Sequence, residues 1–424
     1  MSELIFLTDR YPYNNSEAFI ENEIEITAKN FEKVYILPCG LMVNTNTYRE
    51  VPNNVKVLKQ PLEDDIFKNK PSKLKKILWG IKNLLGWYIL CFFIPDFYKE
   101  CIYMKKNVGL TLQRCTRVLR TLAPALRNMY YYKKKLAKED FTNVYVYSYW
   151  VEPTILFANK IIPNVKIRKQ ICRTHRWDLY SEESPVGYLP FQKKILEVID
   201  KLYVISMDGK GYLSKKYPEL SNKIEVSRLG TKNYGLNPAK TKDSFVIVSC
   251  SNIIPVKRVN LIIDALALLQ TNQRIEWIHF GTGQYAKEIE KYAQIKLDGK
   301  IRYKFKGQVS NFEIIEFYKT NYVDVFVNVS SSEGIPVSIM EATSFGIPII
   351  ATDVGGTGEI VFECKNGFLL PKNFKIEVLS QIITEMIRNN IHNEQLRIQS
   401  RICWQQDYYY KTNYDTFYKD FLGE

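Results

Sequence analysis

The fold is decided by the stretch Ser331-Ser332-Glu333-Gly334-Ile335-Pro336-Val337-Ser338-Ile339-Met340-Glu341-Ala342, which continues through Phe345-Gly346-Ile347-Pro348-Ile349-Ile350-Ala351-Thr352-Asp353-Val354-Gly355-Gly356. Pro336 suits the first position of a helix, where its missing N–H leaves no bond unmade. Gly346 suits the residue after a helix, and the apolar run 347–351 then predicts a buried strand. Another apolar run, 323–327, precedes the stretch. The order strand, loop, helix, strand is typical of a parallel α/β sheet.

This stretch also contains two carboxylates around the start of the predicted helix. Glu333 is expected in the loop at the carboxyl end of the preceding strand, and Glu341 about a turn and a half into the helix. Both can face the crevice in which open α/β sheets bind their ligands. The helix start between them offers free N–H groups and the positive end of the helix dipole, which favour a phosphate. The alternative is a solvated helix start beside a tight turn.

The spacing of Glu333 and Glu341 resembles the paired-glutamate signature of the family-4 retaining glycosyltransferases. The surrounding Gly-x-Pro, Glu-Ala, Gly-Ile-Pro-Ile-Ile-Ala-Thr and Val-Gly-Gly elements match that family in order. The resemblance implies an α/β fold of GT-B architecture. This architecture has two Rossmann-like doubly wound domains that face a central cleft, and a C-terminal helix that crosses back to the first domain.

Alternating apolar runs support this architecture along the whole chain. We expect an acceptor-binding Rossmann-like domain over 1–229 and a nucleotide-sugar-binding one over 230–401. The aromatic-rich segment 402–424 is expected to be the helix that packs back on the N-terminal domain. The predicted strands are 4–7, 34–37, 144–147, 167–172 and 201–205 in the first half, and 245–249, 275–280, 301–305, 323–327 and 347–351 in the second.

The composition limits the partners. The chain has 424 residues, 46% of them hydrophobic, and a formal net charge of +14, which is compatible with nucleic acid, an anionic membrane or phosphate-bearing substrates. No zinc-finger spacing or RNA-binding aromatic motif is present, so we expect no nucleic-acid partner. The eight cysteines form no C-x-x-C pair, and the N-terminus does not resemble a signal peptide. We therefore expect a cytoplasmic protein that works at the inner face of the cell membrane.

The chemistry of sugar transfer requires positive charge near the leaving diphosphate. No Asp-x-Asp occurs and there are only three histidines, so we expect no metal and no other cofactor. The expected substrate is a nucleotide-sugar donor, UDP- or GDP-linked. The resemblance implies a metal-independent hexosyltransferase that retains the anomeric configuration.

Lys257 is the candidate cation for the diphosphate. The segment 251–259 is similar to a family segment in which an Arg and a Lys grip the donor phosphates, and Lys257 lies on the family lysine. The family arginine falls on Asn252, which is a departure from the pattern. Arg258 is expected either to supply the second charge or to be a surface residue. The alternative for Lys257 is a solvated lysine at a helix start.

His175 is the candidate site residue of the first half. It follows the strand 167–172 between Arg173 and Arg176, and these arginines would disfavour its protonated form. By the resemblance it would lie beside the donor sugar and hydrogen-bond a hydroxyl. The alternative is a purely structural histidine.

Further residues complete the expected donor site. The resemblance makes His175, Lys257 and Glu333 the catalytic group, with Glu333 on the sugar hydroxyls and Glu341 on the ribose. The remaining donor-binding candidates are Ser16, Asn252, Arg258, Gly281, Gly283, Gly334, Ile335, Pro336, Val337 and Ser338. Ser16 is also a suitable N-cap for a helix that starts at Glu17. Gly281 and Gly283 would allow close backbone approach to the nucleotide.

The acceptor is expected to be a glycan or a lipid-linked glycan in surface polysaccharide (capsule or lipopolysaccharide) or glycolipid synthesis. Residues 73–94 combine lysines with an apolar face and resemble a helix that lies peripherally on an anionic bilayer; an ordinary core helix is the alternative. Two other functions remain open. One is a non-catalytic GT-B module that binds a partner or membrane, favoured by Asn252, and the other is a GT-B epimerase, hydrolase or phosphorylase.

Overall fold

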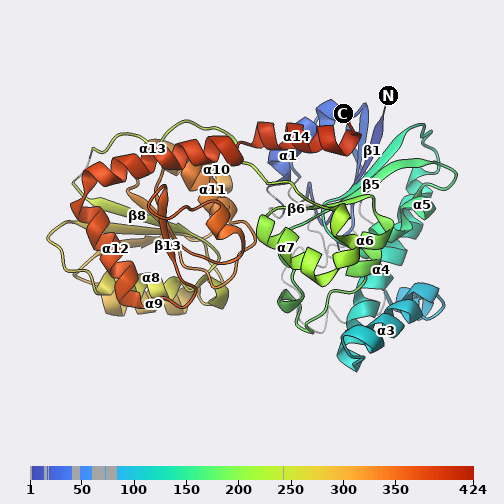
Figure 1. The fold of residues 1–424 in the computed structure, drawn as a ribbon, viewed down its shortest axis with the longest axis horizontal. Coiled ribbons are helices and arrows are strands. Elements are labelled where there is room, and N and C mark those ends of the chain that lie inside the picture. The colour runs from blue at the N-terminus through green and yellow to red at the C-terminus, as the bar shows by residue number, and fades with distance from the viewer. Residues whose placement is uncertain are drawn as a thin grey trace. The chain divides into compact units, whose positions relative to one another are not determined.

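The computed structural model describes residues 2–13, 17, 19–40, 48–59, 72, 84–241 and 243–424. The chain divides into two compact units, which are described separately. The N-terminal unit comprises Met1–Ile205, Gly209–Ser227 and Tyr414–Glu424, and the C-terminal unit comprises Ser206–Asp208 and Arg228–Asn413. Figure 1 shows the chain as a ribbon coloured from blue to red.

The N-terminal unit contains a parallel sheet whose described strands follow the order β3-β2-β1-β4-β5-β6-β7. The strands are nearly continuous apolar runs because helices cover both faces of a parallel sheet. The order reverses between β1 and β4, which makes the carboxyl ends of these strands a switch point for ligand binding. The strands are β1 (Glu3–Thr8), β2 (Lys33–Pro38), β3 (Val55–Val57), β4 (Val144–Ser148), β5 (Ile167–Thr174), β6 (Lys201–Val204) and β7 (Ile224–Val226).

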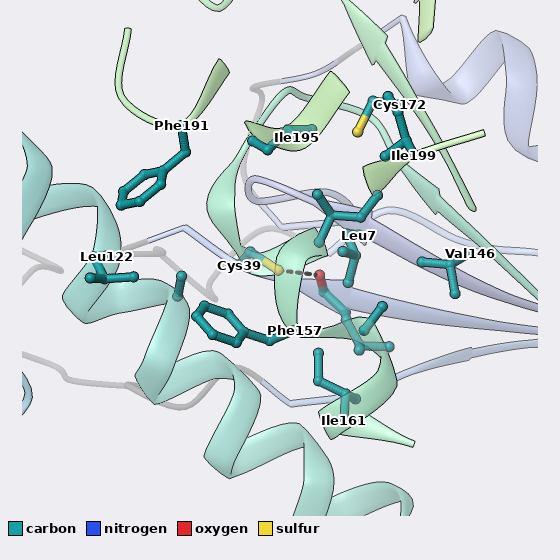
Figure 2. Packing of buried hydrophobic residues seen from close by; sticks show 14 of the residues in the cluster. Leu7, Cys39, Leu122, Val146, Phe157, Ile161, Cys172, Phe191, Ile195 and Ile199 are labelled. Carbon is teal, nitrogen blue, oxygen red and sulfur yellow. Dashed lines mark hydrogen bonds between the residues drawn. The ribbon is translucent and has the colours of Figure 1, made fainter. Parts of the chain in front are cut away.

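The helices of the N-terminal unit are α1 (Ile20–Asn30), α3 (Pro95–Asn107), α4 (Leu112–Leu136), α5 (Ala158–Ile161), α6 (Gln192–Val198), α7 (Met207–Lys216) from Gly209 onward, and α14 (Tyr410–Leu422) from Tyr414 onward. Short 3₁₀ turns cover Pro153–Phe157, Ser181–Glu183 and Pro218–Lys223. One core lies between the sheet and α4, α5 and α6. Figure 2 shows Leu7, Val146 and Cys172 of the strands packed with Leu122 of α4 and Phe191 before α6.

The C-terminal unit contains a second parallel sheet, with the order β10-β9-β8-β11-β12-β13 in the described chain. Its strands are β8 (Phe245–Cys250), β9 (Ile275–Phe280), β10 (Arg302–Phe305), β11 (Val325–Asn328), β12 (Ile349–Thr352) and β13 (Gly367–Leu370). Its helices are α8 (Val259–Ala267), α9 (Ala286–Leu297), α10 (Asn311–Thr320), α11 (Val337–Ser344), α12 (Ile376–Arg388) and α13 (Asn390–Asp407), with 3₁₀ turns at Pro255–Lys257 and Gly355–Glu359. In Figure 1 the helices α8 and α9 cover one face of this sheet and α13 lies over the other.

These two sheets confirm the predicted α/β class. Each of the ten predicted strands overlaps a strand of the structure, whereas the short strands β3, β7 and β13 were not predicted. The first predicted helix was placed too early, since α1 begins at Ile20 and Glu17 has a left-handed backbone with φ +56°. Of the segment 73–94, which resembles a helix on a membrane surface, residues 73–83 lie outside the described part of the chain, and residues 84–91 are helical.

The C-terminal segment forms two helices. Residues 402–413 cluster with the C-terminal unit, and α14 from Tyr414 onward packs on the N-terminal unit. Tyr418 of α14 hydrogen-bonds Thr27 of α1 at 2.6 Å and Glu23 at 3.1 Å. A membrane-spanning helix would need about 20 apolar residues, and no helix in the described part of the chain meets that requirement.

Candidate functional site

Glu333 lies in the loop that follows β11, at the carboxyl edge of the C-terminal sheet. Its carboxylate is buried, and Oε1 accepts a hydrogen bond from Lys257 Nζ at 2.6 Å and from Asn328 Nδ2 at 3.2 Å. Asn328 is the last residue of β11, so the strand itself orients the carboxylate. Two predicted site residues that are distant in sequence are therefore in direct contact.

Lys257 is the last residue of the 3₁₀ turn that follows β8. The Ser331 N–H donates to the Val256 carbonyl at 2.8 Å, which joins this turn to the Glu333 loop. The Lys257 side chain is 19% exposed and that of Glu333 is 8% exposed. The ion pair is thus mostly buried but keeps one side open to a ligand.

The Arg258 side chain hydrogen-bonds backbone carbonyl groups. Its guanidinium donates to the carbonyl of Val329 at 2.6 Å, of Ser330 at 3.1 Å and of Lys372 at 2.7 Å. It has a left-handed backbone conformation with φ +48°, which redirects the chain into α8. Asn252, which stands where the family pattern has its arginine, is exposed at the start of the same loop.

Glu341 lies on α11, about one turn after the helix begins at Val337. Its Oε1 accepts a hydrogen bond from Asn311 Nδ2 at 2.6 Å. Desolvation raises the pKa of Glu341 to about 7, and the hydrogen bond from Asn311 opposes this shift. The pKa of the Glu341 carboxyl group therefore lies close to neutral pH, which no sequence pattern indicated.

The start of α11 lies between the two glutamates. Pro336 is the N-cap and not the first helical residue, and the helix has no side-chain cap. The N–H groups of the first turn have no acceptor within a helix, and those of Val337 and Ser338 belong to this turn. Gly334 and Ile335 form the approach to it. Residues 334–338 thus lead directly from Glu333 into the first turn of α11.

Two glycines allow the surrounding loops to pack closely against each other. Gly281 has φ +131°, and a Cβ atom there would lie 1.9 Å from the Ser251 carbonyl oxygen. A Cβ on Gly283 would lie 2.3 Å from the Ile253 carbonyl oxygen. Both glycines are therefore required where the loop after β9 packs against the loop after β8.

Gly355 has a similar role beside Glu333, although the sequence analysis assigned it no function. It has φ +53°, and a Cβ atom there would lie 2.0 Å from the Glu333 carbonyl oxygen. The following residue, Gly356, donates its N–H to the Gly334 carbonyl at 2.7 Å. The Val-Gly-Gly sequence signalled this contact, since adjacent glycines after a strand favour close backbone packing.

His175 follows β5 in the N-terminal unit and is buried. Its ring stacks against Tyr149 with centroids 4.7 Å apart and lies 4.4 Å from the ring of Trp150. Neither ring nitrogen has a hydrogen-bond partner among the described residues. A buried imidazole with two unpaired nitrogens is a place where a hydroxyl-bearing ligand would be stabilised.

The pKa of His175 lies well below its usual value, first because of burial and second because of Arg173. Arg176 makes a different contact, an ion pair with Glu183 at 2.8 Å. The neutral form is therefore favoured mainly by desolvation and less by Arg173, whereas Arg176 does not contribute to the shift. Asp178 fixes the loop, because its Oδ1 accepts the His175 N–H at 2.9 Å.

The loop after β1 contains a carboxylate that the sequence analysis treated only as a helix residue. Glu17 accepts the N–H groups of Asp9, Arg10 and Tyr11 at 2.6–3.0 Å and the Trp150 indole N–H at 2.6 Å. It thereby organises the loop beside the aromatic rings around His175. Ser16, the predicted N-cap and donor contact, lies outside the described residues, and the described N-cap of α1 is Phe19 without a side-chain cap.

The described residues contain no group of three or more His, Cys, Asp or Glu side chains that could hold a metal ion. Around Glu333, at the carboxyl edge of the C-terminal sheet, the groups described above are the Lys257 ammonium, the carboxylates of Glu333 and Glu341 and the N–H groups at the start of α11. This set can bind a phosphate together with hydroxyl groups. The edge of the N-terminal sheet offers a neutral imidazole among aromatic rings.

Known proteins resemble this chain in sequence and in fold. Residues 237–402 match the family model described as "Glycosyl transferases group 1". The chain is 27% identical over 203 residues to a lipopolysaccharide 1,6-galactosyltransferase of Escherichia coli K12, covering 45% of this chain and 54% of that protein. It is 25% identical over 215 residues to an E. coli UDP-Gal:alpha-D-GlcNAc-diphosphoundecaprenol alpha-1,3-galactosyltransferase, covering 49% and 53%.

These matches span about half the length of the curated relatives. Structural similarity extends further along the chain. The Anabaena protein HepE, solved in complex with UDP-glucose, superposes with a TM-score of 0.61 at 15% identity and covers 100% of both chains. At this level of identity the similarity concerns the fold.

Proposed function

Because the chain belongs to the group 1 glycosyltransferases and has their GT-B fold, we propose that it transfers a sugar from a nucleotide-sugar donor to a glycan or lipid-linked glycan. The reaction would retain the anomeric configuration and serve surface polysaccharide or glycolipid synthesis. The relatives named above act on lipopolysaccharide and on a diphosphoundecaprenol-linked sugar. The observation that supports the proposal best is the contact between Lys257 and Glu333 beside the start of α11.

In this proposal Lys257 and the N–H groups of 337–338 bind the donor diphosphate. The leaving phosphate gains negative charge in the transition state, so a preorganised ammonium and helix N–H groups lower the barrier. The glycines 281 and 283 keep the neighbouring loops close enough to shape this site. We assign Arg258 to bracing the Glu333 loop through its three carbonyl contacts, in place of a direct phosphate contact.

The two glutamates hold hydroxyl groups. Glu333 accepts from hydroxyls of the donor sugar, and Glu341 accepts from the ribose, because an ionised carboxylate can accept from two adjacent hydroxyls. We assign no general-base role to Glu333. The favoured chemistry is attack on the same face of the sugar, with the leaving phosphate taking the proton of the acceptor. His175 forms one hydrogen bond with a sugar hydroxyl through one of its two unpaired ring nitrogens.

Calorimetry with a panel of UDP- and GDP-sugars tests the donor assignment, and product analysis with the donor that binds tests the reaction. We expect one donor to bind and its sugar to appear in a glycosidic bond of retained configuration. Activity should persist with a chelator, because no resident metal is proposed. Donor binding without any product would favour a sugar-binding module, for which Asn252 at the family arginine position is the supporting observation. A free sugar, an epimer or a sugar phosphate would identify one of the other GT-B chemistries.

A further inference from the structure

Exposed apolar side chains are concentrated in one part of the N-terminal unit. Of the 23 large hydrophobic residues recorded as exposed in the described chain, nine fall between residues 85 and 112. Exposed apolar groups scattered singly are normal, but a contiguous group of them marks a surface that contacts something. The nine residues are Leu85, Ile89, Leu90, Phe92, Phe93, Tyr98, Ile102, Leu110 and Leu112.

Seven of the nine belong to the helix 84–91, the turn 92–94 and α3, whereas Leu110 and Leu112 follow α3. We call the two helices and their turn the hairpin, and α3 is the cyan helix beside α4 in Figure 1. Within each arm the outward residues recur four apart, as Leu85 with Ile89 and as Tyr98 with Ile102. Phe93 is 76% exposed at the tip between the arms. The tip is held by the Phe93 N–H, which donates to the Leu90 carbonyl at 2.9 Å, and by the Tyr98 hydroxyl, which donates to the Phe92 carbonyl at 2.8 Å.

The hairpin also has an ordinary inner face. Leu84, Cys91, Phe97 and Met104 are buried, and the last three belong to the core that includes α4. The hairpin is thus apolar on two sides, whereas a helix at a water-exposed surface normally has one apolar stripe. Packing within the unit explains the inner face only.

The exposed charged residues of α3 are all positively charged. Glu100 is buried and accepts hydrogen bonds from the Tyr188 hydroxyl and the Phe191 N–H, and Asp96 pairs with Lys194. These are the only acidic residues of α3, whereas its basic residues Lys99, Lys105 and Lys106 are exposed. The outer face of the helix therefore combines apolar and positively charged groups.

We propose that this face, 85–106, docks the protein on an anionic phospholipid bilayer. Apolar side chains at the tip enter the boundary between head groups and acyl chains, and lysines contact lipid phosphates, as in other interfacial helices. Charge favours this occupant over a second copy of the chain, because two copies related by a two-fold axis would bring the same lysines together. The surface differs from the expectation for 73–94, since its lysines come from α3.

Flotation of the whole chain with lipid vesicles tests the proposal. Vesicles of equal parts phosphatidylglycerol and phosphatidylcholine should bind the protein at low salt, and binding should fall when salt is raised. Pure phosphatidylcholine should bind at least roughly tenfold less, since the lysines then meet no net negative charge on the lipid surface. Absence of binding to the anionic vesicles at low salt would overturn the proposal.

Two variants separate the contributions of this face. Phe93→Ser with Ile102→Ser should reduce binding to anionic vesicles at least about tenfold, because less apolar area enters the boundary. Lys99→Gln with Lys105→Gln and Lys106→Gln should remove most of the preference for the anionic lipid. The matched control is Ile295→Ser with Ile391→Ser, two residues of the C-terminal unit that are 70% and 79% exposed. This control should bind vesicles like the unchanged protein.

If the control loses as much binding as the hairpin variant, the effect is general hydrophobicity and the proposal fails. If the unchanged protein forms a dimer that Phe93→Ser dissociates, and vesicles do not bind, the surface is an interface between copies. The test is independent of the proposed transferase activity, since vesicle binding requires no donor. Calorimetric donor binding by the hairpin variant reports on that activity separately.

Discussion

Lys257 Nζ lies 2.6 Å from Glu333 Oε1, although the two residues are 76 positions apart in the sequence. The pair joins the loop after β8 to the loop after β11 at the carboxyl edge of one sheet. Each group partly neutralises the other in the absence of donor. A diphosphate that approaches Lys257 would therefore bind at a preorganised ammonium, and the sugar hydroxyls would meet a carboxylate that is already oriented.

Removal of Glu333 should abolish transfer while leaving the protein folded. We expect Glu333→Ala to lower kcat by at least roughly 100-fold, the size of effect found for one preorganised polar group in an active site. Circular dichroism and the thermal unfolding midpoint should show an intact fold. Turnover by Glu333→Ala close to that of the unchanged enzyme would refute the assignment.

The same pair should show energetic coupling. Lys257→Ala leaves a mostly buried carboxylate with Asn328 as its remaining described partner, and should lower the free energy of unfolding by about 1–3 kcal/mol. The double variant Lys257→Ala with Glu333→Ala should cost less than the sum of the single variants, because neither charge is then left alone. Urea unfolding of the four proteins measures this coupling, and strict additivity would show that the contact contributes nothing.

Donor affinity should depend on pH through Glu341, whose pKa is raised to about 7. Below that pH the group is protonated and accepts fewer hydrogen bonds, so donor affinity should rise between about pH 6 and pH 8. The pH dependence of the stability has the opposite sign to that of donor affinity. A raised carboxyl pKa means that the folded state binds more protons than the unfolded state. The free energy of unfolding should therefore fall as pH rises between the unfolded and folded pKa values.

Two variants isolate this dependence. Glu341→Gln should remove the Glu341 contribution to the pH dependence of both donor affinity and stability. Asn311→Ala removes the hydrogen bond that lowers the pKa and should move the midpoint of the affinity profile to higher pH. Calorimetric titration with the donor across this range measures both, and an unchanged pH profile in Glu341→Gln would contradict the assignment.

The C-terminal helix α14 should be coupled energetically to β5, the strand that precedes His175. Arg173 is fully buried, lies 3.8 Å from the Glu23 carboxylate and has its guanidinium 4.4 Å from the ring of Phe417 in α14. Arg173→Met should lower the free energy of unfolding by about 3–5 kcal/mol, because it leaves the buried Glu23 without its cation. Arg173→Met with Glu23→Leu should recover much of this loss in chemical unfolding, whereas equal instability of both variants would show that lost packing dominates.

A methyl group at position 281 should destabilise the protein more than the positive φ alone explains, because the Cβ atom would also clash with a neighbouring carbonyl. Gly281→Ala places Cβ against the Ser251 carbonyl at a positive φ, whereas Gly299→Ala has φ +73° with open space around it. Gly299→Ala should cost about 1 kcal/mol for the conformation alone. Gly281→Ala should cost clearly more and weaken donor binding. Equal losses of stability in the two variants would show that the close approach is unimportant.

The behaviour of the histidines gives a spectroscopic check. Burial lowers the pKa of His175 well below its usual value, and burial lowers that of His279 to about 4. The ring signals of both should therefore show no titration between about pH 6 and 8 in nuclear magnetic resonance spectra. A His175 signal that titrates in this range would place the ring in contact with water or an acidic group, against the structure.

The amino-acid sequence predicted the alternation of strands and helices well, because each strand is a local apolar run bounded by glycine or polar residues. It also predicted that Glu333, Lys257 and His175 follow strands, since a motif and its neighbouring run lie within a few residues of each other. The short edge strands β3, β7 and β13 were missed because three or four residues carry little periodicity. The start of α1 was misplaced because Glu17 binds backbone N–H groups instead of continuing the helix.

By itself, then, the sequence determined the fold class and the kinds of chemical group available at the carboxyl ends of the strands. The tertiary structure decided which of these groups meet. It pairs Lys257 with Glu333, directs Arg258 to three backbone carbonyls and packs α14 against Arg173. The physical reason is that such contacts depend on strand order and on the close approach of loops, which join residues far apart in the chain, whereas sequence patterns record only neighbours along it.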